Sequence, residues 1–413
     1  MSRSLFVLLL AVALAAPVAA DEFRQTLISS AKNVNTARWE TTSKEVTPGC
    51  PTVWSIKKYR LHGGKQDGVD LVVVDNGKLT FTVVPTRGMG LLSAQLGDVR
   101  LGWDSPVKDV VHPKHVNLTA RGGLGWLDGF NEFVVRCGLE NNGGPGQDKI
   151  VNNVGDEVSV DLTLHGKIAN VPAREVEVIV DRESPYRIRI RGVVSETMFL
   201  GPKLELTSEI STKPGSDSFR IADTIANVGS QPQEFEVLYH TNFGKPLLEE
   251  GSTFLAPVQR VAPINAHAAK SVSSYGRYQG PTPGWIEQVY CAWPLADAQD
   301  RTMVLIRNRE QDKGASLSYS IKELAYLTLW KNTAAEKDGY VTGIEPGTNF
   351  PFPRRIERKA GRVPKLAGGA SHAATIDVRV HVGKDAVKQA ADRIAAIQGD
   401  RKATIEDSPL KVE

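Results

Sequence analysis

The stretch VDLVVVDNGKLTFTVV, residues 69–84, holds two runs of β-forming residues on either side of one turn. Residues 69–74 and 79–84 are rich in valine and threonine, and the dipeptide Asn76-Gly77 stands between them. An Asn-Gly pair between two such runs is the strongest short-range signal for a β-hairpin. The sequence therefore predicts two antiparallel strands joined by a tight turn at this point.

Similar runs, separated by turn residues, recur along most of the chain. Helical periodicity is almost absent, no fixed repeat indicates a propeller, and the strands are too many for an immunoglobulin-like sandwich. The pattern predicts an all-β fold, a single large antiparallel sandwich. The further strands are expected at residues 91–96, 157–164, 175–180, 187–194, 203–210, 219–226, 235–239, 302–307, 316–321, 325–330 and 375–381.

One segment near the end of the chain has a different period. The sequence KDAVKQAADRIAAIQ, residues 384–398, places apolar residues at helical spacing and is followed by Gly399. We expect an amphipathic C-terminal helix that packs on the sandwich through Val387, Ala391, Ile394 and Ile397. The predicted organisation is a signal peptide (1–20), a partly helical N-terminal extension (21–56), the sandwich domain (57–383) and a helix with a tail (384–413).

The first twenty residues have the features of a secretory signal peptide. Arg3 precedes an apolar run at residues 5–16, and small residues follow up to Ala20. Such a segment is removed on export, so we expect an exported protein, periplasmic or secreted, cleaved near Ala20. No later run approaches the ~20 apolar residues of a membrane span, so no membrane association is expected after cleavage.

The charge and cysteine content of the chain indicate neither a nucleic-acid partner nor a zinc site. The chain has 50 basic and 47 acidic residues and no concentrated basic tract, which gives no indication of a nucleic-acid partner. Its three cysteines, Cys50, Cys137 and Cys291, fit no zinc-site spacing. We expect Cys137 and Cys291 to be buried small residues and Cys50 to be free or disulfide-bonded.

Two histidines and one glutamate are the candidates for chemistry. In EFEVLYHTNFG, residues 234–244, strand alternation places His240 on the polar face at a strand end, before a turn. His165, in the sequence LTLHG, repeats this arrangement. Glu345 lies in GIEPGTNFP, which predicts a stiff loop and a partly buried carboxylate. From the residues alone, each is either an acid/base group or a hydrogen-bonded structural residue.

Six motifs together resemble a known family. PTRGMG, GWDSP, CGLENNGGPG, LHGKIANVPA, LYHTNFGKPLLEEG and GIEPGTNFPFPR occur in this order between residues 57 and 382. They are similar to segments of the aldose 1-epimerase-like proteins, which are related to the galactose mutarotases, and in particular to a bacterial branch with YHTNFG and GIEPGTNFP. The resemblance implies a large β-supersandwich with a concave face that binds a small sugar or glycoside.

The resemblance also implies roles for individual residues. His240 would protonate the ring oxygen, Glu345 would take the proton of the anomeric hydroxyl, and His165 would orient the sugar. An arginine belongs to the pattern, with Arg121 as the best match and Arg87 and Arg136 as competitors. Further ligand contacts are expected at Asn242, Trp330 and Asn349. No metal or organic cofactor is implied, and the mutarotase aspartate that holds sugar hydroxyls has no clear counterpart between His240 and Glu345.

These expectations favour an exported aldose 1-epimerase that interconverts sugar anomers by acid/base catalysis. Two alternatives remain open. A carbohydrate-binding module could have kept the cleft without turnover, and a lyase or hydrolase could act there on a larger or oxidised glycoside. Five tryptophans near polar loops could stack on a sugar or belong to the core: Trp103, Trp126, Trp285, Trp293 and Trp330.

Overall fold

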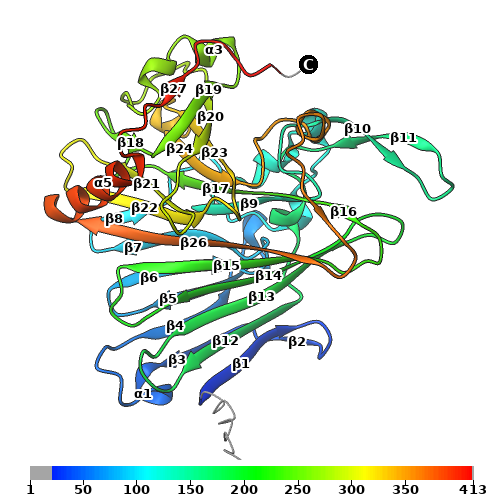
Figure 1. The fold of residues 1–413 in the computed structure, drawn as a ribbon. Coiled ribbons are helices and arrows are strands. Elements are labelled where there is room, and N and C mark those ends of the chain that lie inside the picture. Colours follow the sequence, from blue (N-terminus) through cyan, green and yellow to red (C-terminus); the bar gives the residue numbers. More distant parts are fainter. Residues whose placement is uncertain (1–20, 412–413) are drawn as a thin grey trace, which may run out of the picture.

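The computed structural model describes residues 21–411, and two large β-sheets form the framework of this part of the chain (Figure 1). One hydrophobic core is filled by side chains from both sheets, which makes the molecule a β-sandwich. Neighbouring strands within the sheets run antiparallel, except that β19 (Val258–Pro263) and β27 (Thr404–Ile405) are parallel. The predicted all-β fold is confirmed. The predicted signal peptide, residues 1–20, lies outside the described residues.

The larger sheet has thirteen strands and the smaller one ten. In sheet order, the larger contains β27, β19, β20 (Gln288–Pro294), β23 (Tyr326–Asn332), β24 (Val341–Gly347), β17 (Glu236–Phe243), β9 (Val134–Leu139), β7 (Gly90–Leu96), β6 (Leu79–Val84), β5 (Asp70–Asp75), β4 (Ser55–Arg60) and β3 (Trp39–Thr42), with β8 (Val99–Leu101) beside β7. The smaller contains β18 (Thr253–Leu255), β21 (Arg301–Arg307), β22 (Lys313–Ser320), β26 (Ser371–Val382), β15 (Ser218–Asn227), β14 (Lys203–Thr212), β13 (Ile188–Thr197), β12 (Glu175–Asp181), β1 (Glu22–Ser29) and β2 (Val34–Asn35).

The remaining elements are short and lie in the connections. Two small strand pairs are β10 (Gly146–Val151) with β11 (Glu157–Leu162), and β16 (Gln233–Glu234) with β25 (Lys365–Leu366). The helices are α1 (Ser43–Val46), α2 (Ala120–Gly123), α3 (Ala266–Ala269), α4 (Arg354–Lys359) and α5 (Lys384–Gln398). Single 3₁₀ turns occur at η1 (Gly64–Gln66), η2 (Pro113–His115), η3 (Gly125–Gly129), η4 (Ile168–Asn170), η5 (Val272–Ser274) and η6 (Glu336–Asp338). None of the described helices is both long and apolar enough to cross a membrane.

The hairpin predicted at residues 69–84 forms between β5 and β6, with Asp75 opposite Thr80. The side chain of Asn76 is buried and does more than shape this turn. Its Nδ2 donates hydrogen bonds to Thr212 Oγ1 at 2.8 Å and to the carbonyl oxygens of Lys213 and Ser216. The hairpin of the larger sheet is thereby tied to the β14–β15 turn of the smaller sheet.

The C-terminal helix also forms as predicted. α5 covers residues 384–398, and Gly399 at its end has a φ of 57°, which favours glycine. Ile394 and Ile397 pack against Met303 and Leu305 of β21. Ala390 is buried and Ala391 only partly so, because the stripe facing the sheet turns slightly from the predicted one.

The structure differs from the predicted N-terminal extension at residues 21–56. The regular structure of residues 21–56 is mainly strand: β1 pairs with β12 in the smaller sheet, and β3 pairs with β4 at the edge of the larger one. Helix in this region is limited to the four residues of α1. The sequence of β1 is largely polar because most of its side chains are only partly buried. The segment is therefore built into the sandwich, and residues 55–60, across the predicted boundary, form the single strand β4.

All three cysteines are free, with Cys137 and Cys291 buried as expected.

An ion pair is buried in the core between Arg136, on β9, and Asp223, on β15. Arg136 Nη2 donates to Asp223 Oδ1 at 2.9 Å and to Ser208 Oγ at 2.7 Å. Tyr239, on β17, donates its hydroxyl to Asp223 Oδ2 at 2.8 Å. This cluster joins the two sheets through the core.

Removing the charge of Asp223 should strongly destabilise the sandwich. Asp223→Asn leaves the Arg136 guanidinium buried without a counter-ion, which typically costs about 3–5 kcal/mol. Denaturant unfolding should show a loss of this size in the free energy of unfolding. The same change at the exposed pair of Asp392 with Lys388 should cost at most about 0.5 kcal/mol. Equal losses for Asp223→Asn and Asp392→Asn would show that the core ion pair does not hold the sheets together.

Candidate active site

His240 and Glu345 lie side by side on neighbouring central strands of the larger sheet. The pairing of β17 with β24 matches Leu238 to Gly347 and Thr241 to Ile344, which sets His240 across from Glu345. His240 Nε2 is 3.1 Å from Glu345 Oε1. The residues are 5% and 2% exposed, so both side chains are largely removed from water. The structure thus brings together the two principal candidates.

Two local expectations about these residues were wrong. His240 lies within β17, not at its end, and Glu345 lies within β24, not in a loop. Glycine and proline around Glu345 suggested a loop, but strands on both sides hold this segment extended. The ladder to β17 is broken next to Pro346, which has no N–H to donate. A central strand is a more rigid support than a loop for an acid/base group.

Asn242 determines which nitrogen of His240 carries the proton. Its Nδ2 donates to the carbonyl oxygens of Glu132 and His240, which leaves its Oδ1 as an acceptor 2.7 Å from His240 Nδ1. Nδ1 must therefore be the protonated nitrogen, and Nε2 of the neutral ring faces Glu345 with a lone pair. Asn242 is fully buried, so it positions His240, whereas a direct sugar contact was predicted.

Burial shifts the pKa values of His240 and Glu345 in directions that favour proton transfer. Removal from water lowers the pKa of His240 well below its usual value, and nearby His165 lowers it further. Removal from water also raises the pKa of Glu345 well above its usual value, and the charge of Glu287 adds to this rise. His240 when protonated is thus a stronger acid than a free imidazole, and ionised Glu345 is a stronger base than a free carboxylate.

His165 is held beside this pair by the turn that follows β11. Its ring centre is 5.5 Å from that of His240, and its Nδ1 donates to the Asn142 carbonyl at 2.7 Å. The strand ends at Leu162, three residues earlier than the predicted arrangement requires, and His165 has a φ of 59°. This left-handed conformation is uncommon outside glycine. Gly166 is required next, because a Cβ there would lie 2.3 Å from the carbonyl oxygen of Asn141.

A buried hydrogen-bond network fixes the loop segment to which His165 is bonded. Asn142 donates its backbone N–H to Glu236 Oε2 and its side-chain amide to Asn349 Oδ1, both at 2.9 Å. Asn349 in turn donates to Glu236 Oε1 at 2.8 Å. Burial raises the pKa of Glu236 to about 8. Asn349 was predicted to touch the ligand, but it is buried within this network and acts by fixing the loop that holds His165.

Aromatic rings enclose the two histidines. The His240 ring is 5.1 Å from Phe130 and 5.2 Å from Trp330, and Trp126 lies 4.6 Å from His165. Trp330 is partly exposed, and its Nε1 donates to Glu287 Oε2 at 2.7 Å. Phe130 and Glu287 did not emerge from the sequence, because neither lies in a motif that marks a site. Only the pairing of β20 with β23 brings Glu287 next to Trp330.

Several polar atoms around the pair lack partners, which indicates space for a polar ligand. Among the described residues, Thr328 Oγ1 and Trp126 Nε1 are buried without a hydrogen bond, and Glu345 Oε1 has no neighbouring polar partner except His240 Nε2. Thr328 lies directly opposite Glu345 on β23. Gly343 keeps this space open, because a Cβ there would lie 2.4 Å from Glu345 Oε1 and 3.0 Å from His240 Cε1. Buried unsatisfied groups in a native site usually await a ligand or water.

The three candidate arginines lie in different settings. Arg87 is fully buried, ion-paired to Glu132 and hydrogen-bonded to the Val111 carbonyl at 3.0 Å, so its role is structural. Arg136 belongs to the core ion pair described above. Arg121 is exposed on α2 with a φ of 52°, and Gly123 of the same turn accepts a hydrogen bond from Leu164 N. Of the three, only Arg121 remains available to a ligand.

Among residues 21–411, no group of three or more His, Cys, Asp or Glu side chains is arranged to hold a metal ion.

Comparison with known proteins identifies the family. A model described as a domain of unknown function, DUF4432, matches residues 66–380. The chain belongs to this family. The DUF4432 chain is 40% identical to a protein of Klebsiella pneumoniae subsp. pneumoniae that is provisionally named an aldose 1-epimerase. Their match covers 95% of this chain and 100% of the other, with a TM-score of 0.89. No curated protein matches the chain.

More distant structures share the fold. A galactose mutarotase-like protein from Clostridium acetobutylicum is 12% identical, covering 84% of this chain and 100% of its own, with a TM-score of 0.56. Galactose 1-epimerase from Lactobacillus acidophilus NCFM is also 12% identical, covering 79% and 99%, with a TM-score of 0.50. The DUF4432 chain therefore has the galactose mutarotase-like fold, as its motifs predicted.

His165 is only partly buried, yet the low pKa of its imidazole should be visible in the pH dependence of stability. Burial lowers its pKa to about 4, against about 6.5 in an unfolded chain. Between these values the unfolded chain binds more protons, so His165 makes stability fall as the pH falls from about 6.5 to about 4. His165→Gln cannot titrate, so the difference in unfolding free energy between wild type and variant should change by at most about 3 kcal/mol across this range.

The control for this titration is an exposed histidine. His62 is largely exposed, and His62→Gln should leave the unfolding free energy near the wild-type value at neutral pH. Urea unfolding at several pH values measures both variants. If His165→Gln and wild type show parallel pH profiles, then the imidazole of His165 is not held in its neutral form by the fold.

Proposed function

We propose that this protein is a sugar isomerase of the aldose 1-epimerase type. The observation that carries the proposal is the buried pair of His240 and Glu345, with Nε2 and Oε1 3.1 Å apart on adjacent strands. Interconversion of anomers needs a proton delivered to the ring oxygen and another removed from the hydroxyl on C1. These two oxygens are bonded to the same carbon, so two side chains placed this close can reach both.

The proton count of the pair suits a reversible reaction. With Nδ1 protonated toward Asn242, the pair shares one further proton between Nε2 and the carboxylate. In the reacting form, Nε2–H protonates the ring oxygen while Glu345 accepts the proton of the C1 hydroxyl, and the C1–O ring bond breaks. Rotation about the C1–C2 bond and the reverse transfers then close the ring to the other anomer. The total number of protons on the pair is unchanged throughout.

The surrounding side chains support a sugar as the ligand. Trp330 and Phe130 offer apolar ring faces beside His240, and aromatic faces stack on the C–H face of sugars. His165 Nε2 is free to accept a hydrogen bond from a hydroxyl, because its Nδ1 donates to Asn142. Glu287, held by Trp330, is a carboxylate near Glu345 that could accept hydrogen bonds from sugar hydroxyls. It thus offers a candidate for the role of the missing aspartate.

The test is polarimetry with freshly dissolved α-D-glucose and α-D-galactose, measured against the spontaneous rate. Wild-type protein should accelerate the decay of optical rotation. His240→Ala and Glu345→Gln should each lower the catalysed rate by about 10²–10⁴-fold, since each removes one member of the acid/base pair. His62→Ala and Glu310→Gln change the same residue types at exposed positions and should retain wild-type rates.

Other outcomes would assign the cleft differently. Full activity in His240→Ala and Glu345→Gln would exclude this pair as the acid and base. Sugar binding in calorimetry without any catalysed rotation would make the protein a carbohydrate-binding module. Release of cleaved product from an oligosaccharide or oxidised glycoside would make it a hydrolase or lyase.

A further inference from the structure

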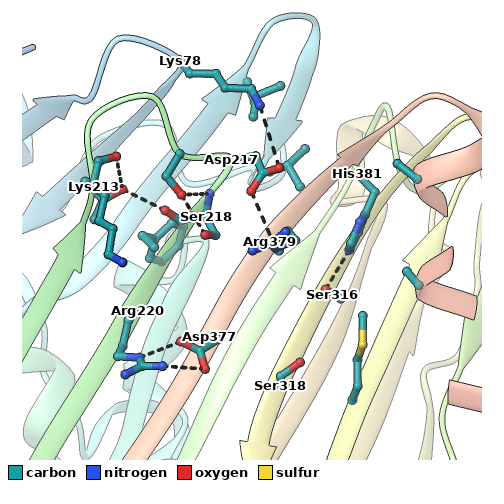
Figure 2. A pocket seen from close by; sticks show the side chains of 18 of the residues that line it. Lys78, Lys213, Asp217, Ser218, Arg220, Ser316, Ser318, Asp377, Arg379 and His381 are labelled. Carbon is teal, nitrogen blue, oxygen red and sulfur yellow. Dashed lines mark hydrogen bonds and ion pairs between the residues drawn. The ribbon is translucent and has the colours of Figure 1, made fainter. Parts of the chain in front are cut away.

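A second pocket lies on the smaller sheet, away from His240. It has a volume of about 980 Å³ and is lined by the outward side chains of β15, β22 and β26, by α5 and by the tip of the β5–β6 hairpin (Figure 2). On these strands, hydrophobic residues such as Ile221, Leu317 and Val378 point into the core, and polar residues alternate with them. The pocket is therefore on the opposite side of the core from the His240–Glu345 pair.

The charged side chains of the pocket are mainly basic. Seven lysines and arginines line it, against two aspartates. Each aspartate is shared between two cations: Asp377 binds Arg220 at 2.7 Å and Arg301 at 2.9 Å. Asp217 lies 3.6 Å from Arg379 and 3.8 Å from Lys78. Both groups of three keep a net positive charge, and Figure 2 shows the Arg220–Asp377 pair apart from the group of Lys78, Asp217 and Arg379.

Three further cations have no acidic partner. Arg187, Lys213 and Arg393 form no ion pair with any of the described residues, and all three are exposed. They come from the residue before β13, the β14–β15 turn and α5, so positive charge surrounds the pocket on several sides. An anion bound here would meet cations that lose no existing partner.

Hydroxyl groups cover the floor between these charges. Ser316 and Ser318 of β22 and Ser218 of β15 line the pocket, and β26 lies between these two strands. His381 Nε2 lies 2.8 Å from Ser316 Oγ and holds it in place (Figure 2). Phe219 is the only Phe, Tyr or Trp among the lining residues that the structure describes, and it is buried. The surface thus combines spread positive charge with short polar donors and lacks an exposed aromatic platform.

We propose that this pocket binds an acidic oligosaccharide through its carboxylate or sulfate groups. The volume is at the upper end of the range for small-ligand sites and suits several sugar rings. Separated cations match charges repeated along a chain better than a single compact anion. Serine hydroxyls supply hydrogen bonds to the ring hydroxyls between those charges. A single-stranded nucleic acid fits less well, because its bases usually stack on aromatic side chains.

The proposal does not depend on the acid/base pair, and titration calorimetry of the full protein tests it. The ligands are trigalacturonic acid, a heparin-derived tetrasaccharide, neutral maltotriose and a short oligodeoxythymidine. We expect binding of the carboxylated or the sulfated saccharide, and the stronger of the two identifies the anionic group. Binding should weaken in high salt, as surface electrostatics require. His240→Ala should bind as tightly as wild type.

The matched variants separate the pocket from overall charge. The triple variant Arg187→Glu, Lys213→Glu and Arg393→Glu should weaken binding about tenfold or more. Lys32→Glu, Lys44→Glu and Lys402→Glu change the net charge equally at exposed positions outside the pocket and should leave affinity within about twofold. The proposal is overturned if neither acidic saccharide binds, if maltotriose or the oligonucleotide binds more tightly, or if both triple variants behave alike.

Discussion

The ion pair of Arg136 and Asp223 joins the two sheets through the core, and the site is built on the strands that it ties. Arg136 lies on β9, and Tyr239, which shares Asp223, lies on β17. His240 follows Tyr239 and points to the other face of the same strand. A buried charge is tolerated only when it is fully paired, so this cluster allows little displacement of β9 and β17. His240 is therefore held on a strand that this cluster fixes, and β24, which carries Glu345, pairs with that strand.

The faces of the larger sheet serve different purposes. Its inner face contributes to the common hydrophobic core, while its outer face carries His240, Glu345 and a second, aromatic cluster that includes Trp126 and Phe130. Loops between the strands cover this outer face and remove the pair from water. Burial then acts on the two groups in opposite directions, lowering the pKa of the imidazole and raising that of the carboxyl. The fold thereby makes a stronger acid and a stronger base from ordinary residues.

Local patterns were good guides where the determinants are local. The Asn76-Gly77 hairpin and the helix at residues 384–398 formed as predicted, because turn chemistry and helical periodicity act over a few residues. The prediction that Glu345 lies in a loop was wrong. It rested on the usual preference of glycine and proline for loops, whereas here the neighbouring strands hold the segment extended. Arg87 and Asn242 were expected at a ligand, yet each is buried against protein groups. Residue type alone could not distinguish these settings.

By itself, the sequence determined the all-β class, the terminal helix and the residue types able to transfer protons, because these follow from periodicity and side-chain chemistry. Only the tertiary structure decided that His240 stands opposite Glu345, that Asn242 selects the protonated nitrogen, and that Glu287 joins them through Trp330. It also gathered seven cations into one pocket, from β15, β21, β26, α5 and three connecting segments. Such contacts join residues far apart in the chain, and their geometry depends on strand register, which no local pattern encodes.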